Sequence, residues 1–197
     1  MDFEKAAAAF DSPLRIERAK ILAKAVREHW GKRPKTVLDF GCGTGLLSYA
    51  LCPYADMIYG HDTSEGMRKV FEKKKALNHT DNVQFLTAEE LCGRTYDVIF
   101  SSMVLHHIAD VQAQIAALKK LLTPGGTFIW IDLYEDDGSF HKNEPGFDGH
   151  NGFSEGEVKH TLQQCGFQSI SLQTVFSGNK LIDEKSVPYS LFLAKAQ

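Results

Sequence analysis

A glycine-rich string, VLDFGCGTG, spans Val37 to Gly45 and carries the strongest chemical signal in the sequence. Apolar strand-like residues run directly into three glycines at alternate positions, and LLSYAL then begins a helical pattern. Glycines at this spacing let the backbone turn sharply and let a ligand lie against bare main chain. The acid Asp39 at the strand end suits a ligand with a local positive charge. We therefore expect a nucleotide-type site for a partly cationic ligand.

A second acid, Asp62, ends the next strand-like run, MIYGHD. A βαβ nucleotide fold places a carboxylate at this point to accept both ribose hydroxyl protons. The alternative is that Asp62 caps a helix that begins near Thr63 and Ser64. The dinucleotide fingerprint requires a third glycine where this chain has Leu46, which argues against a nicotinamide-dependent oxidoreductase.

Five short runs rich in β-branched and aromatic residues must position these acids. They alternate with helical patterns, which predicts βαβ units and a mostly parallel sheet. The predicted strands cover 36–40, 57–61, 83–86, 96–101 and 127–133.

Two helices are well signalled between and before these strands. The N-terminal one has Ser12 as N-cap and Pro13 at its first position, and Gly31 ends it. The other covers 111–122 after the N-cap Asp110, and a Thr-Pro-Gly-Gly turn ends it.

The last part of the chain has a different pattern. Residues 134–153 are polar and turn-rich without a clear period, so this segment is either a lid over a site or a surface loop. Ser154 and Glu157 then form a capping box for a helix that ends at Cys165 and Gly166. Two further strands are predicted over 168–176 and 187–194.

Four strings occur in an order and spacing that resemble a known family: VLDFGCGTG, YGHDTSEGM, YDVIFSSMVLHHI and LLTPGGTFIWIDL. The chain is identified by this resemblance as a class I S-adenosylmethionine-dependent methyltransferase of the small-molecule type. The resemblance implies one α/β domain over residues 1–197, with residues 1–31 as an N-terminal helical cap. Its fold is a Rossmann-like, doubly wound seven-stranded sheet, mostly parallel with an antiparallel last strand and helices on both faces.

The same resemblance implies S-adenosylmethionine as cofactor, with S-adenosylhomocysteine as product. Asp39 would lie near the methionine end of the cofactor and Asp62 would hold the ribose. Many family members carry an Asp-Ala pair after the third strand, but this chain has Thr87-Ala88-Glu89, so Glu89 is the candidate acceptor for the adenine. The full predicted cofactor site is Asp39, Gly41, Cys42, Gly43, Gly45, Asp62, Thr63, Met67, Ala88, Glu89 and Ser101.

Two adjacent histidines follow the fourth predicted strand, where ligands bind in open parallel sheets. His106 and His107 are candidate general bases because a histidine pKa lies near working pH, and His107 is preferred as the family-like position. The alternative is that one of them anchors the helix that begins near Asp110.

Further along the chain, DGSFH followed by HNGF resembles strings in some bacterial members of the family, and this resemblance implies His141 and His150 as candidate contacts to the methyl acceptor. Phe10, near the N-terminus, is a further candidate that would close over an apolar acceptor. The stretch that holds His141 and His150 is rich in acids. Their spacing follows no rigid ligand rule, so we expect solvated carboxylates and no metal.

Composition narrows the class of protein. The 197 residues carry a formal net charge of −3 and 43% hydrophobic residues, as in an ordinary globular domain. The acidic balance argues against nucleic acid as a partner, and no apolar run reaches the ~18 residues that span a bilayer. The four cysteines show no metal spacing, which favours reduced thiols in a cytoplasmic protein. We separately expect the protein to be a monomer or a homodimer.

The sequence thus favours in-line transfer of a methyl group from S-adenosylmethionine to an O, N or C atom of a small molecule. The alternative is a non-catalytic cofactor-binding protein that acts as a regulatory or partner subunit. Turnover separates these two hypotheses, and preference for S-adenosylhomocysteine over NADH separates both from an oxidoreductase.

Overall fold

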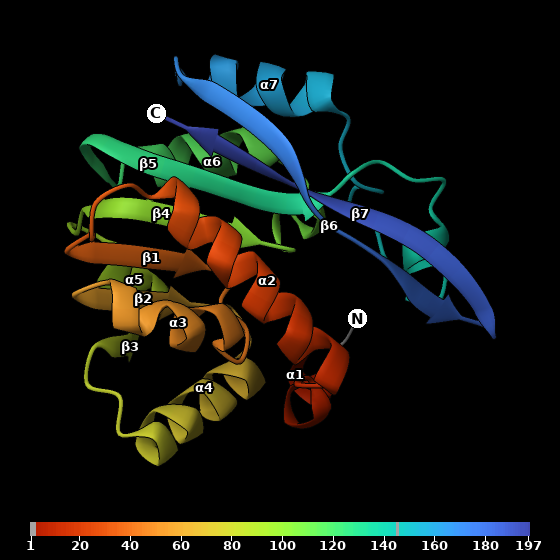
Figure 1. Ribbon diagram of the computed structural model, residues 1–197, viewed down its shortest axis with the longest axis horizontal. Coiled ribbons are helices and arrows are strands. Elements are labelled where there is room, and N and C mark those ends of the chain that lie inside the picture. The colour runs from red at the N-terminus through yellow and green to blue at the C-terminus, as the bar shows by residue number, and fades with distance from the viewer. Residues whose placement is uncertain (1–2, 145) are drawn as a thin grey trace.

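The computed structural model describes residues 3–144 and 146–197, and a single twisted sheet runs through it (Figure 1). Residues 1–2 of the predicted N-terminal cap and residue 145 of the irregular segment lie outside the described residues. The strands are β1 (Thr36–Phe40), β2 (Met57–His61), β3 (Val83–Phe85), β4 (Tyr96–Ser102), β5 (Leu122–Leu133), β6 (Ile170–Ile182) and β7 (Lys185–Ala196). Their order in the seven-stranded sheet is β3-β2-β1-β4-β5-β7-β6.

Strand direction confirms the predicted doubly wound sheet. All neighbouring pairs among β1 to β5 are parallel, whereas β7 is antiparallel to both β5 and β6. β7 is therefore the one strand of this sheet that runs against the others. The chain winds outward in opposite directions from the adjacent strands β1 and β4, so a ligand crevice is expected beyond their carboxyl ends.

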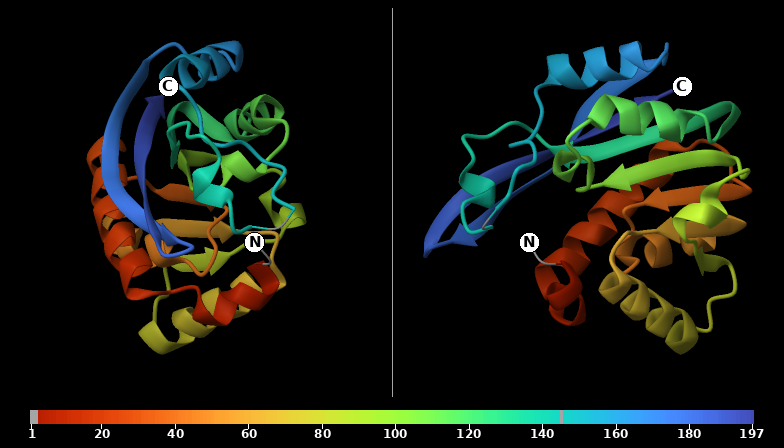
Figure 2. Two further views of the ribbon diagram at one scale, coloured as in Figure 1. Left: turned by 90° about the vertical axis from the view of Figure 1, so that its right-hand side faces the viewer. Right: turned by 180° about the vertical axis from the view of Figure 1, so that it is seen from behind.

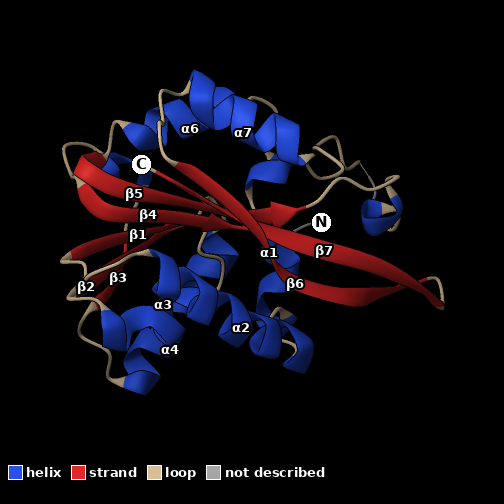
Figure 3. Ribbon diagram, turned by 45° about the horizontal axis from the view of Figure 1, so that its top comes forward, coloured by secondary structure: helices blue, strands red, loops and turns tan. Residues whose placement is uncertain are grey.

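Helices cover both faces of the sheet. They are α1 (Phe3–Ala6), α2 (Pro13–His29), α3 (Leu46–Leu51), α4 (Glu65–Asn78), α5 (Ala88–Leu91), α6 (Val111–Lys119) and α7 (Glu155–Gln164). Figure 3 shows α2, α3 and α4 on one side and α6 and α7 on the other. Each layer buries its own apolar cluster, with Val26 and Phe71 in one and Ile115 and Leu162 in the other. Strands covered on both faces read as near-continuous apolar runs, which explains their clear sequence signal.

The predicted helix ends are confirmed at three places. The Ser12 hydroxyl accepts a hydrogen bond from the Arg15 amide at 3.4 Å, and α2 begins at Pro13. Asp110 caps α6, and the reciprocal capping box of Ser154 and Glu157 begins α7. Among residues 3–144 and 146–197, no helix combines the length and the apolar character needed to cross a membrane.

The boundary between α6 and β5 corrects the sequence prediction. The helix ends at Lys119 instead of 122, and β5 begins at Leu122 instead of 127. The Tyr96 amide donates a hydrogen bond to the Leu121 carbonyl at 2.8 Å. This contact with β4 competes with continuation of the helix, so the chain joins the sheet at Leu122. Strand pairing is irregular here, with a register shift between Tyr96 and Val98.

The last two strands are longer than predicted, and half of their length projects from the sheet. β7 pairs with β5 only from Leu191 to Ala196, whereas Lys185 to Ser190 pair with β6 alone. The result is a two-stranded ribbon that extends past the carboxyl end of β5 (Figures 1 and 2). We call residues 176–190 the ribbon. It forms one wall above the end of the sheet where the predicted site lies.

The segment 134–153 is irregular, as predicted, and is fastened at both ends. The Phe153 amide donates to the Leu133 carbonyl at 3.0 Å, and the His150 amide donates to the His106 carbonyl at 2.7 Å. A short 3₁₀ helix, Ser139–His141, lies against the ribbon, where Lys180 Nζ donates to the Phe140 carbonyl at 2.7 Å. The segment therefore covers the site region from the side of β5. Its role as a lid stays a prediction.

Candidate active site

A cavity of about 320 Å³ lies beyond the carboxyl ends of β1 and β2, and we call it the glycine-loop cavity. Seven of the eleven predicted cofactor residues line it: Asp39, Gly41, Cys42, Gly43, Asp62, Thr63 and Met67. They come from the end of β1, the loop after it, the end of β2 and the first turn of α4. The structure thus brings together residues that two separate sequence strings supply.

The loop after β1 needs glycine for steric reasons. Gly41, Gly43 and Gly45 have φ values of 76°, 52° and 81°, in the left-handed region that side chains disfavour. A Cβ on Gly41 would lie 2.3 Å from a methyl carbon of Val104. The amides of Gly41 and Cys42 both donate to the His61 carbonyl, at 2.8 and 3.0 Å, so β2 holds the loop in place.

Asp39 lies at the inner wall of this cavity and is buried. Its Oδ2 accepts a hydrogen bond of 2.5 Å from the Ser48 hydroxyl on α3. Burial raises the pKa of the Asp39 carboxyl to about 7, the Ser48 hydrogen bond opposes the rise, and the nearby charge of Asp62 adds to it. A cationic group in the cavity would favour the ionised form.

Asp62 is held by two backbone amides. Its Oδ2 accepts from Gly43 at 2.8 Å, and its Oδ1 accepts from Ser64 at 2.9 Å. Ser64, and not Asp62, is the N-cap of α4, because the Ser64 hydroxyl accepts from the Met67 amide. A carboxylate has about four acceptor positions, so two remain for the hydroxyls of a ligand in the cavity.

Four predicted cofactor residues do not line the glycine-loop cavity. Ala88 and Glu89 are exposed on α5, and Ser101 is buried with its hydroxyl bound to the Phe40 carbonyl at 3.0 Å. Gly45 is the N-cap of α3, and a Cβ on it would meet the Phe71 ring. Their contacts to a cofactor stay predictions, and for Ala88 and Glu89 a bound ligand would have to extend past the cavity.

A second cavity of about 370 Å³ adjoins the first, and we call it the histidine cavity. Its walls come from the N-terminal residues, the turn after β4, the 3₁₀ helix near His141 and the ribbon. The two cavities share six lining residues: Phe3, Phe10, Arg15, Arg18, Met103 and His107. A ligand in one cavity would therefore meet a ligand in the other.

The N-terminal arm, residues 3–11, closes over both cavities. Glu4 accepts from the Gly66 amide at 2.7 Å, and Asp11 accepts from the Thr44 hydroxyl at 2.5 Å and pairs with Lys74. These contacts join the arm to α4 and to the glycine loop. The predicted substrate contact Phe10 belongs to the arm and lines both cavities.

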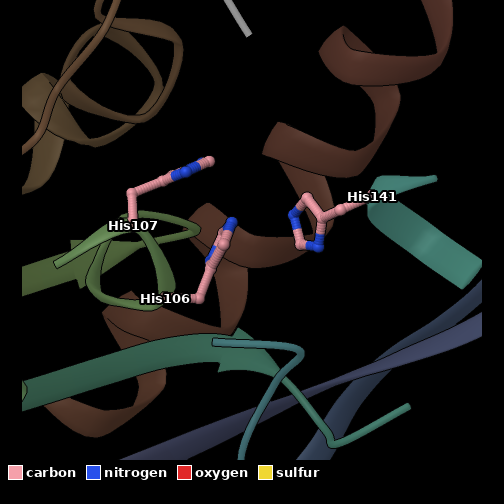
Figure 4. A group of neighbouring side chains, drawn as sticks. All are labelled: His106, His107 and His141. Atoms are coloured by element: carbon pink, nitrogen blue, oxygen red, sulfur yellow. The ribbon is translucent and has the colours of Figure 1, made fainter. Parts of the chain in front are cut away.

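His106, His107 and His141 gather at the wall of the histidine cavity (Figure 4). One ring nitrogen from each lies within 4.8 Å of those of the other two. His106 and His107 come from a 3₁₀ turn after β4, and His141 comes from the irregular segment. The structure thus joins the two predicted bases with one of the two predicted acceptor histidines.

The carboxylate of Asp132, at the end of β5, holds His106. Asp132 Oδ1 lies 2.5 Å from His106 Nδ1, and Asp132 also accepts from the amides of His106 and Leu133 and from the Trp130 indole. Burial alone would raise the pKa of Asp132, but His106 and these hydrogen bonds hold it below its usual value. The ionised carboxylate therefore accepts a hydrogen bond from Nδ1–H of His106, which leaves Nε2 as the ring nitrogen without this partner.

The other two imidazoles of the cluster are neutral near pH 7. Burial lowers the pKa of His107 to about 4, and the neighbouring His106 adds to this effect. Burial lowers the pKa of His141 to about 4 in the same way. Nδ1 of His141 is buried and has no hydrogen-bond partner among the described residues.

His150 lies apart from both cavities. Its Nε2 lies 3.1 Å from the Ile108 carbonyl, and its ring packs at 5.1 Å from that of Phe153. These contacts fasten the irregular segment to the turn after β4. The predicted contact of His150 with the acceptor stays a prediction that no contact here supports.

Sequence reasoning missed the cationic wall of the site. Arg15 and Arg18 line both cavities, and Lys180 reaches the histidine cavity from the ribbon. The two arginines lie three residues apart, so they share a face of α2. This spacing was the feature of the sequence that could have predicted a cationic surface. No ion pair to Arg15 or Arg18 occurs within residues 3–144 and 146–197.

The comparisons with known proteins agree with this geometry. Residues 14–172 match the methyltransferase domain family, and the chain belongs to that family. It is 30% identical over 177 residues to an uncharacterized methyltransferase of Schizosaccharomyces pombe, covering 81% of this chain and 62% of the relative. It is 34% identical over 110 residues to a ubiquinone biosynthesis O-methyltransferase of Rhizobium etli, covering 50% of this chain and 44% of the relative.

The fold is shared with solved methyltransferases. A SAM-dependent methyltransferase from Aquifex aeolicus superposes with a TM-score of 0.70 at 21% identity, over 98% of this chain and 97% of that one. The class predicted from the four sequence strings is thus confirmed at the level of family and fold. The chain spans about half to three-fifths of the length of the two curated relatives described above.

Proposed function

We propose that this chain transfers a methyl group from S-adenosylmethionine to a small-molecule acceptor. The observation that carries the proposal is the junction of two cavities, in which six residues line both. The cofactor occupies the glycine-loop cavity, and the acceptor occupies the histidine cavity. In-line transfer needs the two reactants in contact, and the shared wall of the two cavities supports such an alignment.

The charges of the glycine-loop cavity fit this cofactor. S-adenosylmethionine carries a sulfonium and an ammonium group, and Asp39 supplies a buried acid at the inner wall. Asp62 has two acceptor positions free for the ribose hydroxyls, since Gly43 and Ser64 occupy the others. Met67 and Thr63 lie beside it and supply contacts toward the base.

The histidine cavity favours an acceptor with an anionic group next to the reacting atom. Arg15 and Arg18 line it, and Lys180 pairs at 3.2 Å with Glu144, which is the one carboxylate among its described lining residues. Of these residues, the two arginines are therefore the cations that remain for an anionic group. Phe3, Phe10 and Phe140 add aromatic surface for an apolar part of the acceptor. The relative from Rhizobium etli is named as an O-methyltransferase, which supports an oxygen nucleophile.

The reaction breaks the bond between sulfur and the methyl carbon and forms a bond from that carbon to the acceptor oxygen. S-adenosylhomocysteine leaves as a neutral thioether. The hydroxyl proton of the acceptor must depart, and the cluster of His106, His107 and His141 is where its oxygen would be activated. Asp132 positions His106 for that task.

The first test is calorimetric titration with S-adenosylhomocysteine, with NADH as a parallel ligand. Saturable binding of S-adenosylhomocysteine alone is expected. Screening of small anionic phenols and hydroxy acids for methyl transfer then separates the enzyme from the non-catalytic alternative. Size-exclusion chromatography on the same sample tests the predicted monomer or homodimer. A folded protein that binds neither ligand would contradict the proposal.

Replacement of Asp62 by alanine is expected to weaken S-adenosylhomocysteine binding by about 1–3 kcal/mol, the scale of a lost charged hydrogen bond. Asp62→Asn should lose part of this affinity, because one oxygen can still accept. Asp81→Ala changes an exposed acid in the loop before β3 and serves as the control. Calorimetry measures all three, and unchanged affinity in a folded Asp62→Ala protein would remove Asp62 from the site.

A further inference from the structure

Three imidazoles from two distant parts of the chain converge in the histidine cavity. His106 and His107 lie on one turn after β4, and His141 approaches them from the 3₁₀ helix on the other side of the cluster (Figure 4). Ring centroids of His106 and His141 are 5.1 Å apart, and one nitrogen of each of the three histidines lies within 4.8 Å of the other two. Such a grouping needs a reason, because neutral imidazoles gain little from contact with each other.

Two independent features point to a ligand at this cluster. Nδ1 of His141 is buried and has no hydrogen-bond partner among residues 3–144 and 146–197, although an unpartnered buried polar atom destabilises a fold. Nδ1 of His106 is bound to the Asp132 carboxylate, which orients the ring and leaves Nε2 to the cavity. A carboxylate behind a histidine in this way is the usual outer support of a metal-binding imidazole.

The Asp132 carboxylate also suits a metal ion at the cluster. It is fully buried and accepts hydrogen bonds from His106 Nδ1 and from the amides of His106 and Leu133, so it is a fixed support for the His106 ring. Asp136 and Asp137 of the irregular segment do not line the histidine cavity and accept hydrogen bonds from the backbone within their own turns. Glu144 lines the cavity and pairs with Lys180 at 3.2 Å.

We propose that His106, His107 and His141 bind one divalent transition-metal ion of the Zn²⁺, Co²⁺ or Fe²⁺ class. Imidazole nitrogen suits these ions, and three histidines leave a further position for a ligand from the cavity. Metal–nitrogen bonds of about 2.0–2.1 Å in a tetrahedral site separate the nitrogens by about 3.4 Å. The rings would therefore move together by about 1 Å on binding, within the reach of side-chain rotation.

This inference rests on the proposed function, because it states how the acceptor oxygen is activated. The hydroxyl of the acceptor binds the ion, which lowers its pKa, and its proton leaves to water. The resulting oxyanion attacks the methyl carbon as the bond to sulfur breaks. The ion keeps its charge and oxidation state throughout, so no reductant or oxidant is needed. The sequence analysis expected no metal because the spacing of the acids and histidines in and before the irregular segment follows no rigid ligand rule.

The test uses the full chain with any polyhistidine tag removed and all metal stripped by a chelator. Titration with Co²⁺ is followed by visible absorption, and Zn²⁺ content after dialysis is measured by mass spectrometry. We expect one ion per chain, with a Co²⁺ spectrum of low-coordinate nitrogen ligands. His107→Ala and His141→Ala should each weaken binding at least tenfold, whereas His160→Ala, on the exposed side of α7, should bind as the wild type does.

Folding and cofactor binding are measured on the same samples. Each variant is checked by thermal melting and by titration with S-adenosylhomocysteine, and His141→Gln replaces any alanine variant that fails to fold. Wild-type protein that retains no Co²⁺ or Zn²⁺, or His141→Ala that binds as well as wild type, would overturn the metal site. Metal-free protein that transfers methyl groups at the full rate would overturn it too, while the proposed function would stand. Metal binding without any affinity for S-adenosylhomocysteine would contradict the proposed function alone.

Discussion

Replacement of Asp132 by asparagine is expected to lower methyl-transfer turnover about 100-fold and to leave S-adenosylhomocysteine affinity within twofold of wild type. Asp132 is buried and accepts from His106 Nδ1, from two backbone amides and from the Trp130 indole. Asparagine keeps the shape but presents an amide nitrogen toward one of these donors. His106 then loses its fixed orientation, and the histidine cluster no longer activates the acceptor oxygen. Asp132 does not line the glycine-loop cavity, so the cofactor should bind normally.

Steady-state kinetics with the identified acceptor and calorimetry with S-adenosylhomocysteine measure the two quantities separately. Asp148→Asn changes an exposed acid in the irregular segment and is the matched control. In a His106→Gln background, Asp132→Asn should have little further effect, because Asp132 acts through His106. Equal losses of turnover and cofactor affinity would instead assign Asp132 to the scaffold, and additive losses would contradict its action through His106.

The second large effect concerns pH. S-adenosylhomocysteine affinity is expected to rise about tenfold between pH 6 and pH 8, as the Asp39 carboxyl ionises around its pKa of about 7. Only the ionised carboxyl attracts the ammonium group of the ligand.

The stability of the ligand-free protein should change in the opposite direction. The pKa of Asp39 is raised from 3.8 by burial, so the folded protein binds this proton more tightly than the unfolded chain. Between pH 3.8 and about pH 7 the unfolded chain holds fewer protons at Asp39 than the folded protein does. Rising pH therefore favours unfolding and lowers the free energy of unfolding by on the order of 2–4 kcal/mol over this range.

Asp39→Asn separates this effect from the titration of the ligand and of other residues. The variant should bind S-adenosylhomocysteine weakly at pH 8, with a flatter pH profile, and should melt at a higher temperature than wild type at pH 8 without ligand. Calorimetry across pH 6–8 and thermal melting test both parts. An unchanged pH profile in Asp39→Asn would show that another group controls the affinity.

Much of the framework could be predicted from the sequence because its signals are local. Strands such as β1 and β2 are buried on both faces, so composition alone marks them, and Ser12 and Asp110 satisfy amides within three residues of themselves. The glycines after β1 are required by backbone conformation, which is also local. The predicted start of β5 was wrong because the Leu121 carbonyl accepts a hydrogen bond from the amide of Tyr96. Tyr96 is distant in the sequence, so no local pattern reveals this contact.

The site was less predictable because its chemistry depends on contacts between distant segments. The sequence does not distinguish the two adjacent histidines. In the structure only His106 hydrogen-bonds the Asp132 carboxylate, whereas His107, the preferred base, lines the glycine-loop cavity. The distinction requires the register of β4 against β5. Arg15 and Arg18 were missed for a similar reason, since their helix faces the cavity only when α2 lies across the sheet.

The arm formed by residues 3–11 has a kinetic consequence. The contacts of Glu4 with Gly66 and of Asp11 with Thr44 join the arm to the glycine loop and to α4, beside the glycine-loop cavity. The histidine cavity has the exposed Leu181 of the ribbon at its rim. We expect these arm contacts to slow exchange of the methyl donor more than exchange of the acceptor, so that S-adenosylmethionine binds first and S-adenosylhomocysteine dissociates last. Product inhibition would then be competitive toward the methyl donor and noncompetitive toward the acceptor.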